Sequence, residues 1–240
     1  MRYSDPDVID ISKIRAVSID LDDTLWPVWP TIERAERALQ LWLAANAPQT
    51  AKLHESVDTR RAIRAQLDAS RPDLRHDFTT LRLESIRIAL VRAEEDPALA
   101  EAAFEVFFAE RQRVDLYDDA LPALEHLASR WPLVALSNGN ADVHRVGIGR
   151  YFKAKVAARE VGFGKPDQRI FQAAARAAGV EARQVLHIGD DPALDALGAL
   201  AAGMQSVWLN RTGQPWAHDP SPHLTVAGLN ELRGKLEFVE

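Results

Sequence analysis

Short apolar runs alternate with amphipathic segments along much of the chain. The apolar runs cover residues 14–19, 133–136, 185–188 and 206–209, with a weaker one at 223–226. Helical periodicity lies between them, at 118–130, 140–147, 167–178 and 192–202. Strands that are apolar on both sides are typical of a parallel sheet whose two faces are covered by helices. We therefore predict an α/β fold built on a parallel sheet.

The interval between the first two apolar runs departs from this alternation. Four segments with helical spacing follow one another there without an intervening strand: 31–47, 50–68, 76–93 and 97–113. A crossover between parallel strands needs far less chain than this interval provides. We predict an inserted module of four helices over residues 25–114, and a core domain made of residues 1–24 and 115–240.

Composition excludes several classes of protein. The net charge of −6 argues against a general nucleic-acid binder, although a local basic pocket remains compatible with it. The absence of cysteine excludes disulfides, thiolate metal sites and cysteine nucleophiles. No apolar run is long enough to cross a membrane, and the first residues lack the apolar stretch of a signal peptide. We expect a cytoplasmic protein that acts on neither nucleic acid nor membranes.

Acidic residues follow two of the predicted strands at the point where each strand ends. Asp20, Asp22 and Asp23 come after the first strand, and Asp190 and Asp191 come after the third. Ligands of an open parallel sheet bind outside the carboxyl ends of its strands. Clustered carboxylates repel one another unless a cation offsets their charge, and Mg²⁺ prefers oxygen ligands. The alternative is that these acids cap the following helices. We predict a Mg²⁺ site.

Two further segments could hold a phosphate group. Ser137, Asn138 and Gly139 follow the second strand, where a hydroxyl and free backbone N–H groups can bind phosphate oxygens. Lys165 follows a glycine and precedes Pro166, and its charge could neutralise a phosphate beside the carboxylates. Each segment alone is equally typical of an ordinary turn or an exposed loop lysine.

Taken together, the four segments resemble a known pattern. Asp20-x-Asp22-x-Thr24, Ser137, Lys165-Pro166 and Gly189-Asp190-Asp191-x-x-x-Asp195 are similar, in this order, to the four motifs of the haloacid dehalogenase-like hydrolase superfamily. The resemblance implies a Rossmannoid parallel sheet core with an inserted helical-bundle cap. The stretches DLDDTLW, HDFTTLRLESI, WPLVALSNGNAD and HIGDDPALD look more narrowly like the bacterial phosphatases of flavin mononucleotide and 5-amino-6-(5-phosphoribitylamino)uracil.

The resemblance also implies a reaction and the residues that perform it. Asp20 would be the nucleophile that forms an aspartyl-phosphate, and Asp22 would be the general acid and base. Asp22 favours a phosphatase, since the name-giving dehalogenases lack it and expel a halide that needs no proton. The full set that it implies is the catalytic residues Asp20, Asp22 and Lys165; the Mg²⁺ ligands Asp20, Asp22, Asp190 and Asp191; the phosphate-binding residues Thr24, Ser137, Asn138 and Lys165; and Asp195, which would position Lys165.

The substrate is expected to be a small phosphomonoester, with flavin mononucleotide and ribitylaminouracil phosphate among the best. Candidate contacts in and near the insert are Trp26, Trp29, His76 and Arg82. The tryptophans could stack on a substrate ring or pack the insert onto the core, and Arg82 could equally be a surface residue. Two other functions remain open: a phosphomutase of the same fold and a non-catalytic phosphate-binding module. The pattern leaves the oligomeric state open.

Two other features are assigned no catalytic part. His187 precedes the fourth motif inside a predicted strand and is expected to be a buried, hydrogen-bonded core residue. The stretch 208–223 is typical of an edge loop, and no residue in it is expected to take part in catalysis.

Overall fold

The computed structural model describes residues 9–237, which form two compact units. Of these residues, the first unit contains 9–27 and 115–237, and the second is Val28–Val114. The second unit begins at Val28 rather than at residue 25, and Leu25 and Trp26, which belong to the first, are fully buried. The Leu25 carbonyl also accepts a hydrogen bond from the Tyr117 amide, at 2.9 Å.

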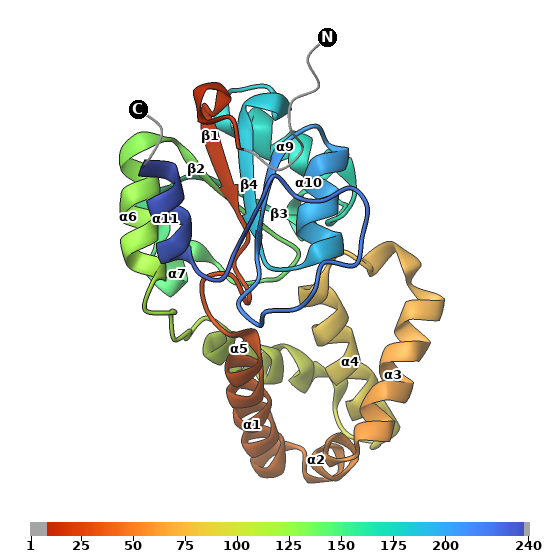
Figure 1. Ribbon diagram of the computed structural model, residues 1–240. Coiled ribbons are helices and arrows are strands. Elements are labelled where there is room, and N and C mark those ends of the chain that lie inside the picture. Colours follow the sequence, from red (N-terminus) through yellow and green to blue (C-terminus); the bar gives the residue numbers. More distant parts are fainter. Residues whose placement is uncertain (1–8, 238–240) are drawn as a thin grey trace. The chain divides into compact units, whose positions relative to one another are not determined.

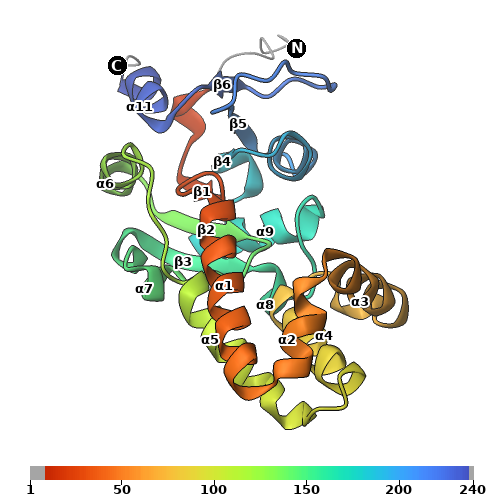
Figure 2. The same ribbon diagram turned by 90° about the horizontal axis from the view of Figure 1, so that it is seen from below.

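The first unit is built on a six-stranded, fully parallel sheet (Figures 1 and 2). The strand order is β3-β2-β1-β4-β5-β6, so that β1 lies between β2 and β4. The chain leaves β1 toward β2 on one side and returns to β4 on the other, which creates a topological switch point beside β1. The strands are β1 Ala16–Ile19, β2 Leu133–Ser137, β3 Phe152–Ala157, β4 Val185–Gly189, β5 Gln205–Leu209 and β6 Leu224–Val226.

The register of the three central strands sets where their carboxyl ends lie. Ile19 of β1 pairs with Ala135 of β2 and with Ile188 of β4. Every residue of these three strands is buried, which explains their continuous apolar runs. The polar residues that follow them therefore meet at one edge of the sheet.

Strand β3 is absent from the sequence prediction. Its residues alternate between exposed lysines and apolar side chains, because it pairs only with β2 and lies at the edge of the sheet. Charged residues on an edge strand hinder pairing with another chain. The same charges interrupt the apolar run by which buried strands are recognised.

Helices cover both faces of the sheet. In Figure 2, α6 Ala120–Arg130 and α11 Leu229–Glu237 lie on one face and α9 Gln168–Ala178 on the other. Helix α9 buries Ile170, Phe171 and Ala174 along one stripe, and Gly179 ends it with a positive φ of 82°. The remaining short elements are α7 Val143–Val146, α8 Ala158–Val161, η1 Ile11–Lys13, η4 Gly149–Tyr151 and η5 Ala182–Gln184.

The helix predicted over 192–202 is present but does not begin as an α-helix. It consists of a π-helical turn, η6 Pro192–Leu197, followed by α10 Gly198–Ala201. The Ala196 amide donates to the Asp191 carbonyl at 3.1 Å, which is an i to i+5 bond. Such wide turns occur often at functional sites, and this one carries Asp195.

The second unit contains five α-helices, all within residues that the structure describes. The predicted helix over 50–68 is divided into two, because Ser56 has an extended backbone and its side chain caps the second part. Residues Ala35, Leu39 and Leu43 form a buried stripe that packs with Phe104 and Phe107. The elements are α1 Val28–Asn46, α2 Pro48–Glu55, α3 Val57–Ser70, η2 Pro72–Leu74, α4 Phe78–Arg92, η3 Pro97–Leu99 and α5 Ala100–Arg111.

Across residues 9–237 no helix combines the length and apolar character needed to cross a membrane.

Candidate active site

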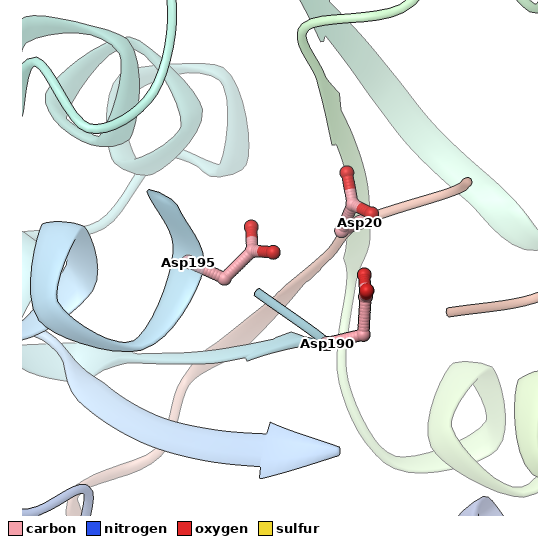
Figure 3. Close-up of side chains that lie close together, drawn as sticks. All are labelled: Asp20, Asp190 and Asp195. Atoms are coloured by element: carbon pink, nitrogen blue, oxygen red, sulfur yellow. The ribbon is translucent and has the colours of Figure 1, made fainter. Parts of the chain in front are cut away.

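Three aspartates converge at the carboxyl edge of the sheet (Figure 3). Asp20 directly follows β1, Asp190 directly follows β4, and Asp195 lies on the π-helical turn η6. One carboxylate oxygen from each lies within 4.8 Å of the other two. Because β1 and β4 are hydrogen-bonded neighbours, the close approach of Asp20 and Asp190 follows directly from the strand order.

A buried lysine joins two of these acids. The Lys165 ammonium contacts Asp20 Oδ1 and lies 2.6 Å from Asp195 Oδ1. Its side chain is only 3% exposed. Although burial alone would lower the pKa of Lys165, the charges of Asp195 and Asp20 outweigh it, and the pKa is raised. Lys165 therefore carries a permanent positive charge in the site.

The acids share this single positive charge unequally. Burial would raise the pKa of Asp195, but Lys165 and a hydrogen bond from His187 lower it to about 2. Burial, followed by the charges of Asp195 and Asp23, raises the pKa of Asp190 to about 7. Burial also raises the pKa of Asp20, an effect that Lys165 opposes. Asp20 and Asp190 are therefore the two carboxylates that lack sufficient cationic compensation.

These charges fit a divalent cation. Three carboxylates and one ammonium sum to −2 when all are ionised. Asp195 already uses both of its oxygens, since Oδ1 contacts Lys165 and Oδ2 accepts the Asp191 amide at 3.1 Å. Asp20 and Asp190 are thus the carboxylates of this group that could hold a divalent cation.

Asp195 is held by a chain of buried hydrogen bonds. His187 Nε2 lies 3.1 Å from Asp195 Oδ1, and His187 Nδ1 lies 2.9 Å from the Ser18 hydroxyl. Burial lowers the pKa of His187, so the ring is neutral and donates its Nε2 proton to the ionised Asp195. The prediction of a buried, hydrogen-bonded His187 is confirmed. Gly189 is required here, since a Cβ on it would lie 2.3 Å from Asp195 Cγ.

The loop after β2 is fastened to the loop that carries Lys165. The Asn138 side chain donates to the Lys165 carbonyl at 2.9 Å and accepts from the Lys165 amide at 2.7 Å. Gly164 allows this approach, because a Cβ there would lie 2.7 Å from Asn138 Oδ1. The Ser137 hydroxyl is buried and accepts the Gly139 amide at 2.9 Å. The Asn138 side chain therefore positions the backbone of Lys165.

Asp22 and Asp191 occupy separate surroundings. Asp22 Oδ1 accepts the Trp26 indole N–H at 2.9 Å, and Trp26 is fully buried. Trp26, one of the predicted substrate contacts, thus directs its indole N–H to Asp22. Asp191 Oδ1 accepts the amides of Ala193 and Leu194, both at 2.8 Å, and so caps the π-helical turn.

Three predicted contacts lie in the second unit. Trp29 is 71% exposed near the start of α1, and His76 is partly buried between η2 and α4. Arg82 pairs with Glu36 at 2.7 Å, and its guanidinium lies 4.4 Å from the Phe107 ring centre. The Arg82 side chain is thus partly engaged within its own unit.

Two residues that the sequence analysis left without a role contact the acidic loops. Trp208 donates its indole N–H to the Asp190 carbonyl at 2.8 Å. Arg211 donates to the Thr24 carbonyl at 3.0 Å, and the Thr24 hydroxyl in turn donates to Asp190 Oδ1 at 3.2 Å. The only signal in the sequence is that Trp208 lies near the carboxyl end of a predicted strand, where polar groups approach the ligand.

Known proteins resemble this chain in sequence and in fold. A family model for haloacid dehalogenase-like hydrolases matches residues 14–203. The 5-amino-6-(5-phospho-D-ribitylamino)uracil phosphatase YigB of Escherichia coli is 35% identical over 240 residues, covering 97% of this chain and 98% of that protein. Phosphoserine phosphatase of Thermus thermophilus is 37% identical over 152 residues, 61% of each chain. A structure described as a 2-haloacid dehalogenase from Pseudomonas syringae matches with a TM-score of 0.89 and 38% identity, covering 93% of this chain and 98% of that one.

Sequence and fold thus agree with the arrangement of the site. The family model extends from β1 to the end of α10, and so contains Asp20, Lys165 and Asp190. The chain is an enzyme that belongs to the haloacid dehalogenase-like hydrolases.

Proposed function

We propose that this enzyme is a Mg²⁺-dependent phosphomonoester hydrolase that forms an aspartyl-phosphate on Asp20. The observation that carries the proposal is the buried contact of Lys165 with Asp20 and Asp195. Asp190 lies beside this contact, and burial and neighbouring acids raise its pKa to about 7. A buried cation next to a carboxylate nucleophile lets a phosphate dianion approach that carboxylate. The phosphatase names of the curated relatives support the same class of reaction.

Asp20, Asp190 and the backbone carbonyl of Asp22 are the groups we propose to hold Mg²⁺, with Asp191 nearby directly or through water. A bound Mg²⁺ ion supplies positive charge that offsets the repulsion between the carboxylates and the phosphate. Lys165, the Ser137 hydroxyl and the Asn138 amide bind the transferring phosphate oxygens in this proposal. Thr24 orients the first loop, and Asp195 positions Lys165.

The reaction has two steps that regenerate the enzyme. In the first, an Asp20 oxygen bonds to phosphorus as the bond to the alcohol oxygen breaks, and Asp22 gives its proton to that oxygen. In the second, Asp22 takes a proton from water, the water oxygen bonds to phosphorus, and the bond from Asp20 to phosphorus breaks. Inorganic phosphate leaves, and both aspartates return to their starting states. Trp26, which donates to Asp22 Oδ1, directs the Asp22 side chain.

Three other functions make different products. A phosphomutase would yield an isomerised ester without inorganic phosphate, and a binding module would yield neither. A dehalogenase, as the Pseudomonas syringae relative is described, would release halide from a 2-haloacid. Asp22 favours the phosphatase over the dehalogenase, because an alkoxide leaving group needs a proton and a halide does not. Assays of inorganic phosphate and halide on the same preparation separate these functions.

We predict that chelation with EDTA abolishes hydrolysis of p-nitrophenyl phosphate and that added Mg²⁺ restores it. Without the cation, Asp20 and Asp190 repel both each other and the substrate. Ca²⁺ should restore little activity, since it accepts a looser coordination geometry than Mg²⁺. A circular dichroism spectrum before and after chelation serves as the control for folding. Full activity in the metal-stripped protein would sink the metal-dependent mechanism.

We predict that flavin mononucleotide and ribitylaminouracil phosphate are among the best natural substrates. The relative from Escherichia coli supports ribitylaminouracil phosphate, and its similarity extends through the second unit as well as the core. Flavin mononucleotide is included because of the motif resemblance. The measurement is kcat/KM over a panel that also contains phosphoserine, a pyrimidine nucleotide and hexose phosphates. A preference for hexose phosphates over every ring-bearing ester by about tenfold, or about 1.4 kcal/mol, would overturn the substrate and leave the mechanism intact.

A further inference from the structure

The carboxyl end of β5 reaches both acidic loops of the site. Trp208 donates its indole N–H to the Asp190 carbonyl at 2.8 Å, and it is almost fully buried. Arg211, two residues beyond the strand, donates to the Thr24 carbonyl at 3.0 Å. Both acceptors are backbone carbonyls. These contacts therefore fix the backbone of each loop and do not use the acidic side chains.

Arg211 is itself held in one orientation. Its two terminal nitrogens donate to Asp119, at 2.9 and 3.1 Å, and its guanidinium lies 3.9 Å from the centre of the Tyr117 ring. Asp119 Oδ2 also accepts the Leu229 amide at 2.8 Å. Burial would raise the pKa of Asp119, but these hydrogen bonds outweigh it and lower the pKa. Asp119 is therefore ionised and fixes the guanidinium plane that meets Thr24.

The two loops need such support because the sheet no longer holds them. The Asp20 amide still donates to the Ile188 carbonyl of β4, at 2.9 Å. Beyond that point, the Thr24 hydroxyl and Asp190 Oδ1 connect the two loops at 3.2 Å. Trp208, within β5, and Arg211, two residues beyond it, hold the backbone at the two ends of this contact.

We propose that Trp208 and Arg211 are positioning residues that fix the distance between the loop of Asp20 and Asp22 and the loop of Asp190. This inference rests on the proposed function, because it assigns these loops to Mg²⁺ binding and phosphoryl transfer. Residues that orient metal ligands without binding the metal themselves typically contribute about 10- to 100-fold to metal affinity or activity. A displacement of reacting groups by about 1 Å can cost a similar factor.

Two conservative substitutions test the proposal. Arg211→Lys keeps the positive charge but replaces the planar guanidinium by a single nitrogen. One nitrogen cannot occupy both the position that meets Asp119 Oδ2 and the position that meets Asp119 Oδ1 and Thr24. Trp208→Phe keeps a large aromatic ring and removes the indole N–H. The matched controls are Arg183→Lys, whose arginine pairs with Glu181 on the surface, and Trp131→Phe, whose tryptophan follows α6.

The readouts are the Mg²⁺ dissociation constant by isothermal titration calorimetry without substrate, kcat and KM for p-nitrophenyl phosphate, and thermal unfolding. We expect each test variant to bind Mg²⁺ about 10-fold more weakly and to lose about 10- to 100-fold in kcat. KM should change by less than about threefold, because the phosphate-binding groups lie on the other loops. The control variants should match the wild type in Mg²⁺ affinity, kcat and KM.

Variants that stay folded and bind Mg²⁺ as the wild type does would overturn the positioning role. A lower unfolding temperature with unchanged Mg²⁺ affinity and kcat would also overturn it, since that is the result of a purely structural contact. A wild-type protein that binds Mg²⁺ but hydrolyses no phosphomonoester would refute the proposed function, while the Mg²⁺ affinities would still decide the positioning role. A wild-type protein that binds no Mg²⁺ would refute both.

Discussion

Asp20→Asn should abolish phosphomonoester hydrolysis while the protein stays folded. The asparagine amide has nearly the same shape as the carboxylate and can still accept a hydrogen bond from Lys165. It cannot attack phosphorus, and it is a weaker ligand for Mg²⁺. Loss of a nucleophile lowers kcat by on the order of 10⁴- to 10⁶-fold. The measurement is steady-state hydrolysis of p-nitrophenyl phosphate at saturating Mg²⁺.

Acid-quenched samples provide the direct test of the covalent step. Wild-type protein that is stopped during turnover should carry phosphate bound to the chain, and Asp20→Asn should carry none. Asp68→Asn is the matched control, since Asp68 lies exposed on α3 and pairs with Arg64. Turnover by Asp20→Asn within about tenfold of the wild type would exclude Asp20 as the nucleophile.

Lys165→Met should abolish activity and also destabilise the fold. The side chain has a similar length but no charge, so that Asp20 and Asp195 lose the cation that each of them contacts. Removing one partner of a buried ion pair costs about 3–5 kcal/mol of unfolding free energy, because the remaining charge is buried and unpaired. Urea denaturation in the presence of EDTA measures this loss without a contribution from metal binding.

The destabilisation of Lys165→Met should grow with pH. In the wild type, Lys165 is a main cause of the low pKa of Asp195, which is about 2. Without Lys165, burial remains and raises the pKa of Asp195 in the folded state above its value in the unfolded chain. A carboxyl group with a raised folded pKa loses stability as the pH rises through that pKa. The difference from the wild type should therefore be larger at about pH 8 than at about pH 5.

Lys155→Met is the control for this prediction. Lys155 also pairs with two acids, Asp142 at 2.8 Å and Glu160 at 3.1 Å, but its side chain is 35% exposed. Such surface pairs contribute at most about 1 kcal/mol, so this variant should retain activity and most of its stability. An equal loss of stability in both lysine variants would contradict the special role of the buried pair.

Much of the fold follows from local patterns in the sequence. The apolar runs that end at Asp20, Ser137 and Asp190 are buried strands, because only strands covered on both faces need to be apolar throughout. Elements with weaker local signals were missed or simplified. The lysines of β3 obscure an edge strand, and Ser56 divides a helix within one amphipathic stretch.

The sequence by itself determined which chemical groups stand at the strand ends. Asp20, then Lys165, then Asp190 and Asp195 along the chain already indicate a charged site at the carboxyl edge of a parallel sheet. Their order and spacing suffice because strand direction places the residues that follow each parallel strand at the same edge.

Only the tertiary structure decided how each of these groups is used. Trp26 donates its indole N–H to Asp22, and Asp195 is occupied by Lys165 and His187. The contact of Arg211 with Thr24 joins residues 187 positions apart. Local periodicity reports which side of an element is buried, whereas such contacts depend on strand order, register and loop path. Hydrogen-bond partners at that range are therefore fixed by the assembled sheet and not by neighbouring residues in the chain.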